Sequence, residues 1–161
     1  MAEDIFLKIE SDKVDGESTD KAHKDELEIQ SWSWGVSNAG SAHRGTGAGT
    51  GKASFSDASF MMTMDKAAPI LMQSSGTGVH HKKCTLTQRR AGGKEQVEFV
   101  KLTMEDVLVS SVQVSSSGQD AMVSFTLNFA KFKIEYTPQA ASGGKNAKTE
   151  FSYNIAENAT A

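Results

Sequence analysis

Residues 121–136 read Ala-Met-Val-Ser-Phe-Thr-Leu-Asn-Phe-Ala-Lys-Phe-Lys-Ile-Glu-Tyr, the longest strand-like run in the chain. The first half places large apolar side chains at odd positions, from Val123 to Phe129, and the second half places them at even positions, from Phe132 to Tyr136. Because side chains alternate between the two faces of a strand, this change of phase requires an extra residue or a move between sheets. We therefore predict a β-bulge or a sharp bend near Asn128–Lys131.

The same change of phase occurs twice more, between Ile29 and Trp32 and between Val109 and Val112. Bends repeated in several strands are typical of a small, strongly curved barrel. A second interpretation is that some strands are apolar on both faces, with one face on the core and the other on a partner subunit. The two interpretations are compatible.

Alternating apolar and polar residues recur along the rest of the chain, between clusters of glycine, serine and aspartate. We predict further strands at Asp4–Ile9, Leu27–Ser37, Ala53–Phe60, Lys82–Arg90, Glu95–Met104, Val107–Val114 and Glu150–Ile155. The short segment Ala91-Gly92-Gly93-Lys94 lies between two such runs and predicts a hairpin.

One short helix is predicted around Ile70, Leu71 and Met72, with Asp65 as its N-cap, Pro69 in its first turn and Gly76 at its end. About eight strands and one helix indicate a β-barrel or a sandwich. With the repeated bends, the expected fold is mainly β: a small curved barrel with one short helix and a long glycine-rich loop.

Composition bounds the class of protein. The chain has 161 residues, enough for one domain, and 17 basic against 20 acidic residues give a net charge of -3, which disfavours a nucleic-acid binder. The N-terminus carries no basic segment followed by an apolar run, so we expect no signal peptide. The longest apolar stretches fall far short of the ~20 residues of a membrane span.

The motifs that carry chemistry are weak, so we predict no cofactor, no metal and no catalytic residues. Thr46–Ala53 resembles a phosphate-binding loop but lacks the required first glycine and final hydroxyl. His80, His81 and Cys84 offer three potential metal ligands without a fourth at a usual spacing. His23 and His43 lie in polar loops, where we expect them to be solvated.

The segment from Ser37 to Gly51 contains almost no apolar anchor. A loop of this length without its own secondary structure is usually functional or disordered. Glycine at alternate positions from Gly45 to Gly51 would let it adopt several backbone shapes and become ordered on contact with a partner.

Several blocks of the sequence resemble one family, in order and along essentially the whole chain. They are Asp4–Ile9, Val14–Ser18, Leu27–Ile29, Ser31-Trp32-Ser33-Trp34-Gly35-Val36-Ser37, Thr85–Gly93, Val107–Val112, Thr126–Ala130 and Tyr153–Ile155. The Trp-Ser-Trp-Gly block is the most specific of them. The resemblance is to the haemolysin-coregulated proteins, the tube proteins of the bacterial type VI secretion system.

This resemblance implies one tube-subunit domain over residues 1–161. It implies homohexameric rings that stack into a tube, with a contractile sheath around the tube and a spike at its tip. The tube carries effector proteins in its lumen, resides in the bacterial cytoplasm before firing, and is then secreted without a signal peptide. The expected partners are therefore further copies of the chain, the spike, the sheath and effectors, with no nucleic acid and no membrane span.

The resemblance also assigns residues. The lumen-facing serine of the family matches Ser33, and alternation places Ser31 on the same face. Strands at Leu27–Ser37, Glu95–Met104 and Ala121–Tyr136 are the expected ring contacts. The expected ring-stacking residues are Asn38, Gly40, His43, Arg44, Gly45, Gly47, Gly49 and Gly51.

Two other functions remain open on the residues alone. One is a small ligand-binding β-barrel carrier with a closed interior. The other is a hydrolase that uses His80 or His81 with Cys84.

Overall fold

The computed structural model describes residues 3–11, 14–39, 52–92, 95–139 and 147–161. The strands are β1 (Glu3–Glu10), β2 (Leu27–Glu28), β3 (Ser31–Ser33), β4 (Val36–Asn38), β5 (Ala53–Phe55), β6 (Ala58–Thr63), β7 (His80–Gly92), β8 (Glu95–Ser116), β9 (Ala121–Tyr136), β10 (Thr149–Asn154) and β11 (Ala159–Thr160), and the helix is α1 (Ala68–Thr77). The prediction of a mainly β fold with one helix is confirmed.

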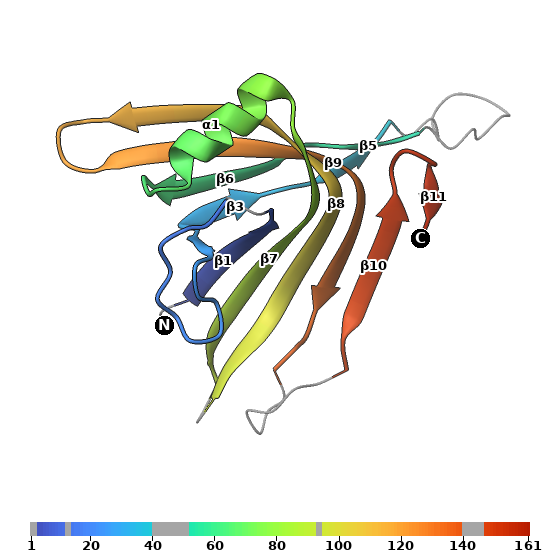
Figure 1. The fold of residues 1–161 in the computed structure, drawn as a ribbon. Coiled ribbons are helices and arrows are strands. Elements are labelled where there is room, and N and C mark those ends of the chain that lie inside the picture. The colour runs from blue at the N-terminus through green and yellow to red at the C-terminus, as the bar shows by residue number, and fades with distance from the viewer. Residues whose placement is uncertain (1–2, 12–13, 40–51, 93–94, 140–146) are drawn as a thin grey trace, which may run out of the picture.

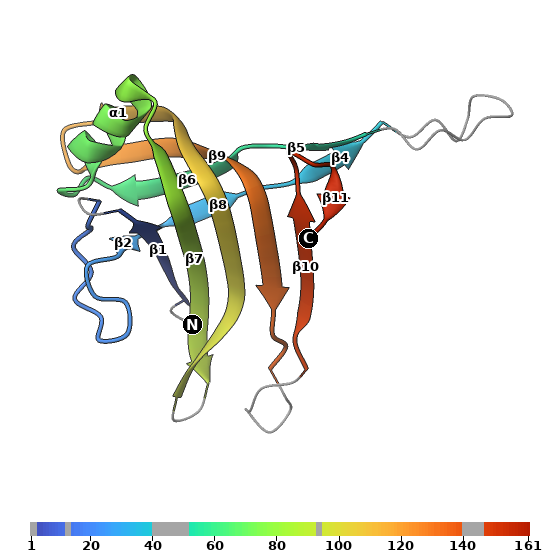
Figure 2. The same ribbon diagram turned by 45° about the vertical axis from the view of Figure 1, so that its right-hand side comes forward.

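One strongly curved sheet forms most of the molecule. It contains nine of the described strands. Seven of them pair in the order β11-β10-β9-β8-β7-β1-β2, β6 branches from β9, and β3 pairs with β6. β4 and β5 form a separate two-stranded sheet. In Figures 1 and 2 the long strands β7, β8 and β9 run side by side and bend together, so that the sheet wraps around the core. Within the described residues no continuous ladder closes the sheet, which is therefore barrel-like rather than a sealed barrel.

The predicted bend in residues 121–136 is confirmed, and its cause is a change of neighbouring strand. Residues 122–127 of β9 pair with β6, whereas residues 131–136 pair with β10. The buried side chains follow the same division. In the first half they are at odd positions, up to Phe129, and in the second half the buried side chain is at an even position, Phe132. Opposite the change, β8 carries Asp106 with a φ of 54°, in the left-handed region that aspartate tolerates.

The change of phase between Val109 and Val112 has the other predicted cause, an extra residue in the strand. The register between β8 and β9 shifts between Val109 and Ser111, which marks an extra residue in β8. The prediction of separate strands on either side of Glu105 and Asp106 is wrong, since β8 runs without interruption over 22 residues. Pairing with β7 and β9 on its two edges keeps this long strand together.

The predicted single strand at Leu27–Ser37 is instead three short ones. β2 pairs with β1, and β3 pairs with β6, so the phase change between Ile29 and Trp32 is a crossing from the β1 edge of the sheet to the branch that β6 forms beside β9. Backbone hydrogen bonds hold the crossing, from Ile29 N to Ile5 O at 2.9 Å and from Gln30 N to Met61 O at 2.8 Å. The predicted strand Ala53–Phe60 is likewise divided into β5 and β6.

The helix begins and ends later than predicted. Ala67, and not Asp65, is its N-cap residue. Asp65 lies two residues earlier, where its Oδ1 accepts a hydrogen bond from Ala67 N at 2.8 Å. Gly76 lies within the helix, which ends at Gly78, whose φ of 68° gives the left-handed cap that glycine adopts without strain. The helix packs against β8 and buries Leu71 and Ser74.

The interior of the curved sheet is filled with apolar side chains from every long element. The fully buried set includes Leu7, Leu27, Met62, Leu71, Leu86, Leu102, Met104, Phe125, Leu127 and Phe132. Close packing of this kind supplies most of the driving force for folding.

Candidate functional site

A neutral, hydroxyl-rich surface covers the outward side of β3, β6, the first half of β9 and the end of β8. Strand pairing aligns its side chains in two rows that cross all four strands. One row is Ser33, Ser59, Thr126 and Ser111, and the next is Ser31, Met61, Ser124 and Gln113. We call these eight residues the hydroxyl face.

The two tryptophans of β3 and its flank determine which way the serines point. Trp32 is half-buried against the core and donates from Nε1 to Gln88 Oε1 at 3.1 Å. Trp34 packs against Phe132, with ring centroids 4.6 Å apart, and donates from Nε1 to Ser56 O at 2.9 Å. Since side chains alternate, Ser31 and Ser33 must face outward, and both are exposed.

Buried aromatic rings fix the other strands of the face in the same way. Phe60 of β6 and Phe125 of β9 point inward and stack with ring centroids 5.1 Å apart. Ser59 and Thr126, each next to one of these rings in sequence, therefore point outward. The whole face is thus set by the packing of the core beneath it.

Hydrogen bonds order one end of the hydroxyl face and leave the other end available. The Thr126 hydroxyl lies 2.7 Å from Ser110 Oγ and 2.6 Å from Ser111 Oγ, and Ser110 Oγ donates to Asp57 Oδ2 at 2.7 Å. Asn128 Nδ2 also donates to Asp57, at 2.9 Å. At the opposite end, the hydroxyls of Ser31, Ser33 and Ser59 make no hydrogen bond within the described residues.

The face is hollowed rather than flat. A depression of about 500 Å³ lies over it, and its lining consists of the hydroxyl face with Trp32, Phe60 and Phe125 beneath. None of the side chains that line it is charged. Hydroxyl groups both donate and accept hydrogen bonds, so this surface can contact many neutral partners without requiring one arrangement.

Comparison with known proteins identifies the family. The model of a family described as the type VI secretion system effector Hcp matches residues 6–136. Protein hcp1 of Pseudomonas aeruginosa is 43% identical, over 100% of both chains. The chain belongs to the Hcp family. Membership makes it a structural component of the type VI secretion system, as the resemblance of the sequence implied.

Solved structures agree with this assignment. Hcp1 from Salmonella typhimurium superposes with a TM-score of 0.82 at 32% identity, over 100% of both chains. A structure described as that of a type six secretion system protein superposes with a TM-score of 0.89 at 29% identity, over 98% of each chain.

The residues predicted to stack rings fall almost entirely outside the described residues. Gly40, His43, Arg44, Gly45, Gly47, Gly49 and Gly51 lie there. Asn38 is described: it is the last residue of β4, is exposed, and pairs in register with Ala53 of β5. The role of this segment stays a prediction.

The alternative functions lose their structural basis. Cys84 is fully buried, and burial raises the pKa of its thiol to about 12, so it would be protonated and inaccessible at neutral pH. His81 is buried, and its Nε2 lies 3.2 Å from Ser74 Oγ. His80 is exposed, and its Nδ1 lies 2.9 Å from Asp106 Oδ1, so neither histidine forms its hydrogen bond with Cys84. The carrier alternative requires a hollow interior, and core side chains fill it.

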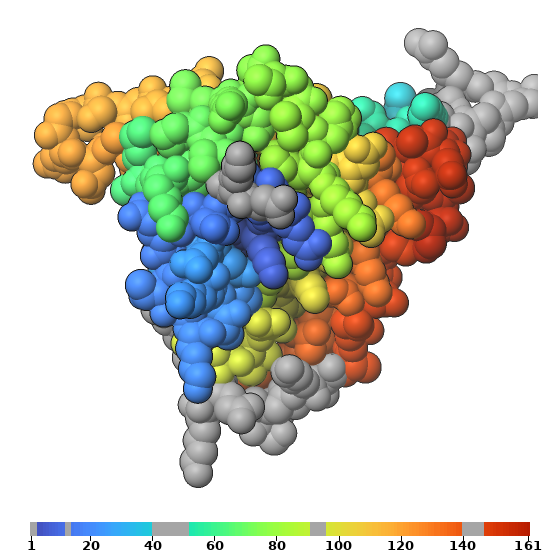
Figure 3. All heavy atoms as spheres, in the orientation of Figure 1, coloured from blue at the N-terminus to red at the C-terminus, as the bar shows by residue number. Residues whose placement is uncertain are grey.

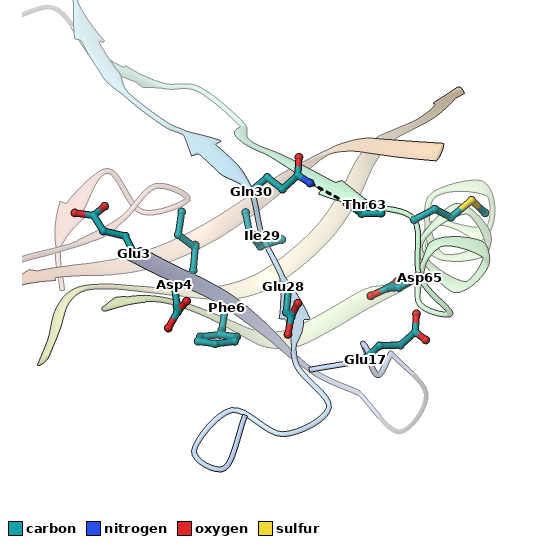
Figure 4. A pocket seen from close by; sticks show the side chains of 11 residues that line it. Glu3, Asp4, Phe6, Glu17, Glu28, Ile29, Gln30, Thr63 and Asp65 are labelled. Carbon is teal, nitrogen blue, oxygen red and sulfur yellow. Dashed lines mark hydrogen bonds between the residues drawn. The ribbon is translucent and has the colours of Figure 1, made fainter. Parts of the chain in front are cut away.

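A second depression lies between β1, β2 and the end of β6 with the residues that follow it, and much of its lining is acidic (Figure 4). Its volume is about 400 Å³, and Gln30 donates to Thr63 Oγ1 at 2.8 Å across one side. Burial raises the pKa of the Asp65 carboxyl, whose neighbour Glu17 adds to the effect. No group of three or more potential metal ligands is found among the described residues.

Sequence reasoning missed the environment of His23, which is buried rather than solvated. Its ring stacks on Phe6 with centroids 4.5 Å apart, and its two nitrogens face carboxylates of Glu26 and, at 3.0 Å, Glu98. Arg89 lies over the same phenylalanine at 4.8 Å. These contacts attach the polar loop that contains His23 to β1. In the sequence, the aromatic Phe6 on the outer face of the predicted first strand is the one residue that indicates a packing partner on that side.

None of the helices in the described part of the chain is long and apolar enough to cross a membrane.

Proposed function

We propose that this Hcp protein is the subunit of a homohexameric ring, that rings stack into the type VI secretion tube, and that the hydroxyl face lines the lumen in which effector proteins travel. The observation that carries the proposal is the hydroxyl face itself. Its neutral side chains align across four strands, and Ser33 of the Trp-Ser-Trp block lies within it.

The chemistry of the face suits a passage for varied cargo. Charged side chains would attract some effectors strongly and repel others, and a large apolar surface would hold them too tightly. Small hydroxyls instead offer many weak, exchangeable contacts. The unpartnered hydroxyls of Ser31, Ser33 and Ser59, among the described residues, are the groups that would contact cargo.

Ring closure requires a heterologous contact, in which one side of a subunit meets a different side of the next. The end of β8 supports such a contact. Beyond Leu108 its pairing with β7 ends, so among the described residues Ser110–Ser116 have a strand neighbour only in β9. This segment belongs to the hairpin tip that stands out from the body in Figure 3 (orange), and Val114 on it is 42% exposed. An unpaired edge next to an exposed apolar side chain favours pairing with another chain.

The remaining assignments follow the family resemblance. The segment from Asn38 to Gly51 would contact the next ring, and the sheath, the spike and effectors would be the further partners. The chain would act as one tube-subunit domain, without catalysis, in the cytoplasm before firing and outside the cell afterwards.

Native mass spectrometry tests the ring. We expect an assembly of about six subunits, roughly 100 kDa, in dilute neutral buffer. A monodisperse monomer at micromolar concentration would contradict the proposal.

Ser33→Gln tests the lumen. Ser33 is exposed, so a longer side chain has room, and the hexamer should form as in the wild type. Retention of a cognate effector during purification should fall, because glutamine would project into the passage. Loss of the hexamer in this variant would place Ser33 in a subunit contact instead.

A further inference from the structure

Met61 is the large apolar side chain in the middle of the hydroxyl face. In register it lies between Ser31 of β3 and Ser124 of β9, and along β6 its neighbours on the same face are Ser59 and Thr63. Four hydroxyl-bearing residues therefore surround it. It is 42% exposed, whereas Met62, the next residue, is fully buried.

The position of Met61 follows from the alternation of β6. Phe60 and Met62 fill the core on the inward side, so the side chain between them must point outward. Exposure of a large apolar side chain gains nothing for the isolated subunit. A serine at this position would join the hydroxyls of Ser31 and Ser124, so the methionine stands out from its surroundings.

An apolar centre inside a polar rim is the usual form of a binding hot spot. Its core contributes most of the affinity, and the rim excludes water from it. A methionine is well suited to such a centre on a promiscuous surface, because its flexible thioether adapts to different partners. The depression over the face, of about 500 Å³, lies within the range of ligand pockets and has room for protein side chains.

We propose that Met61 is the residue that gives the hydroxyl face its affinity for cargo, by contacting an exposed apolar side chain of the transported protein. No charged side chain lines the depression to bind a nucleic acid or an ionic ligand, so its occupant is a neutral, apolar group, and the proposed passage of effectors makes that group part of a polypeptide. This inference rests on the proposed function of the face and adds the determinant of its selectivity.

A peptide titration followed by NMR of ¹³C-methyl-labelled methionine tests the inference. The probe is a blocked heptapeptide, Ser-Gly-Ser-Leu-Ser-Gly-Ser, together with versions that carry alanine or lysine at the centre. The chain has seven methionines, and the Met61→Leu variant assigns the Met61 signal by its absence. We expect the leucine peptide to shift the Met61 signal and the alanine and lysine peptides to leave it in place.

Two substitutions of Met61 test whether its apolar side chain provides the affinity for the leucine peptide, and a third substitution elsewhere controls for the effect of any methionine-to-glutamine change. Met61→Gln keeps the length of the side chain but makes it polar, and should weaken binding of the leucine peptide about fivefold or more. Met61→Leu should retain binding. Met72→Gln is the matched control, because Met72 on α1 is 48% exposed and lies outside the hydroxyl face.

The inference is overturned if the wild-type Met61 signal does not respond to the leucine peptide. It is equally overturned if Met61→Gln binds as well as the wild type, or if Met72→Gln weakens binding as much. The titration needs neither a ring nor a tube. A hexamer with an unresponsive Met61 would therefore defeat this inference alone, and a monomer with a responsive Met61 would defeat the proposed ring alone.

Discussion

Replacing Trp34 by alanine should destabilise the protein and disturb the position of Ser33. The Trp34 ring contacts three other aromatic rings, with centroids 4.6 Å from Phe132, 5.7 Å from Phe129 and 6.0 Å from Phe55. Its Nε1 also donates to Ser56 O at 2.9 Å. The indole thus joins the segment after β3 to β5 and to the bend of β9.

The magnitude follows from these contacts. Truncation of a fully buried tryptophan to alanine costs about 3–5 kcal/mol. Trp34 is only half-buried, which places the loss in free energy of unfolding below this range, at about 2–3 kcal/mol. The hydrogen bond to Ser56 is exposed and adds little to this figure.

Urea unfolding at one fixed subunit concentration measures the effect, because assembly makes apparent stability depend on concentration. Trp34→Phe should recover most of the loss, since it keeps an aromatic ring in the cluster. Val36→Ala is the control: Val36 is 59% exposed, and its truncation should change stability by less than about 0.5 kcal/mol. The reasoning fails if Trp34→Ala unfolds at the same urea concentration as the wild type, or if Trp34→Phe is as unstable as Trp34→Ala.

Four further outcomes are expected. Gly16→Ala should lower the urea midpoint strongly, because an added Cβ would lie 2.8 Å from the Leu27 Cα and nearer still to the Glu26 carbonyl; a midpoint equal to that of the wild type would disprove the close approach. Cys84 should resist iodoacetamide at pH 8 in the folded protein and react once urea unfolds it, as followed by mass spectrometry, since burial raises its pKa to about 12. The hydrogen bond from Arg89 lowers the pKa of the Asp20 carboxyl from its ordinary value of 3.8 to about 2. The contribution of this carboxylate to stability is therefore present above pH 3.8 and is lost as the pH falls through 2; Asp20→Asn should reduce the change in urea midpoint over that interval, and an unchanged pH dependence would contradict the assignment. Deletion of residues 42–50 should leave the ring intact in native mass spectrometry and weaken tube formation, and an unfolded subunit would count against a role confined to stacking.

The sequence by itself determined the local features of this protein. Alternation is a property of single strands, so the burial phase of residues 121–136, its reversal after Phe129 and the outward direction of Ser31 and Ser33 were all predictable. The family could also be identified from the sequence, because its Trp-Ser-Trp-Gly block and the other blocks occur in order along the chain.

Apart from β7 and β8, whose pairing the predicted hairpin implied, only the tertiary structure decided which strands are neighbours. The sequence of one strand does not distinguish a bulge from a change of neighbouring strand. The reversal of the burial phase in β9 comes from the exchange of β6 for β10 as its neighbour, and the one in β8 comes from a shift of register, and neither cause could be assigned from the sequence. The hydroxyl face has the same origin. Ser33 and Ser31 were predictable, but Ser59, Met61 and Thr126 join them only through pairing between β3, β6 and β9, which are far apart in the chain. Pairing depends on how all the apolar faces pack together around one core, and that is a property of the whole fold rather than of any segment.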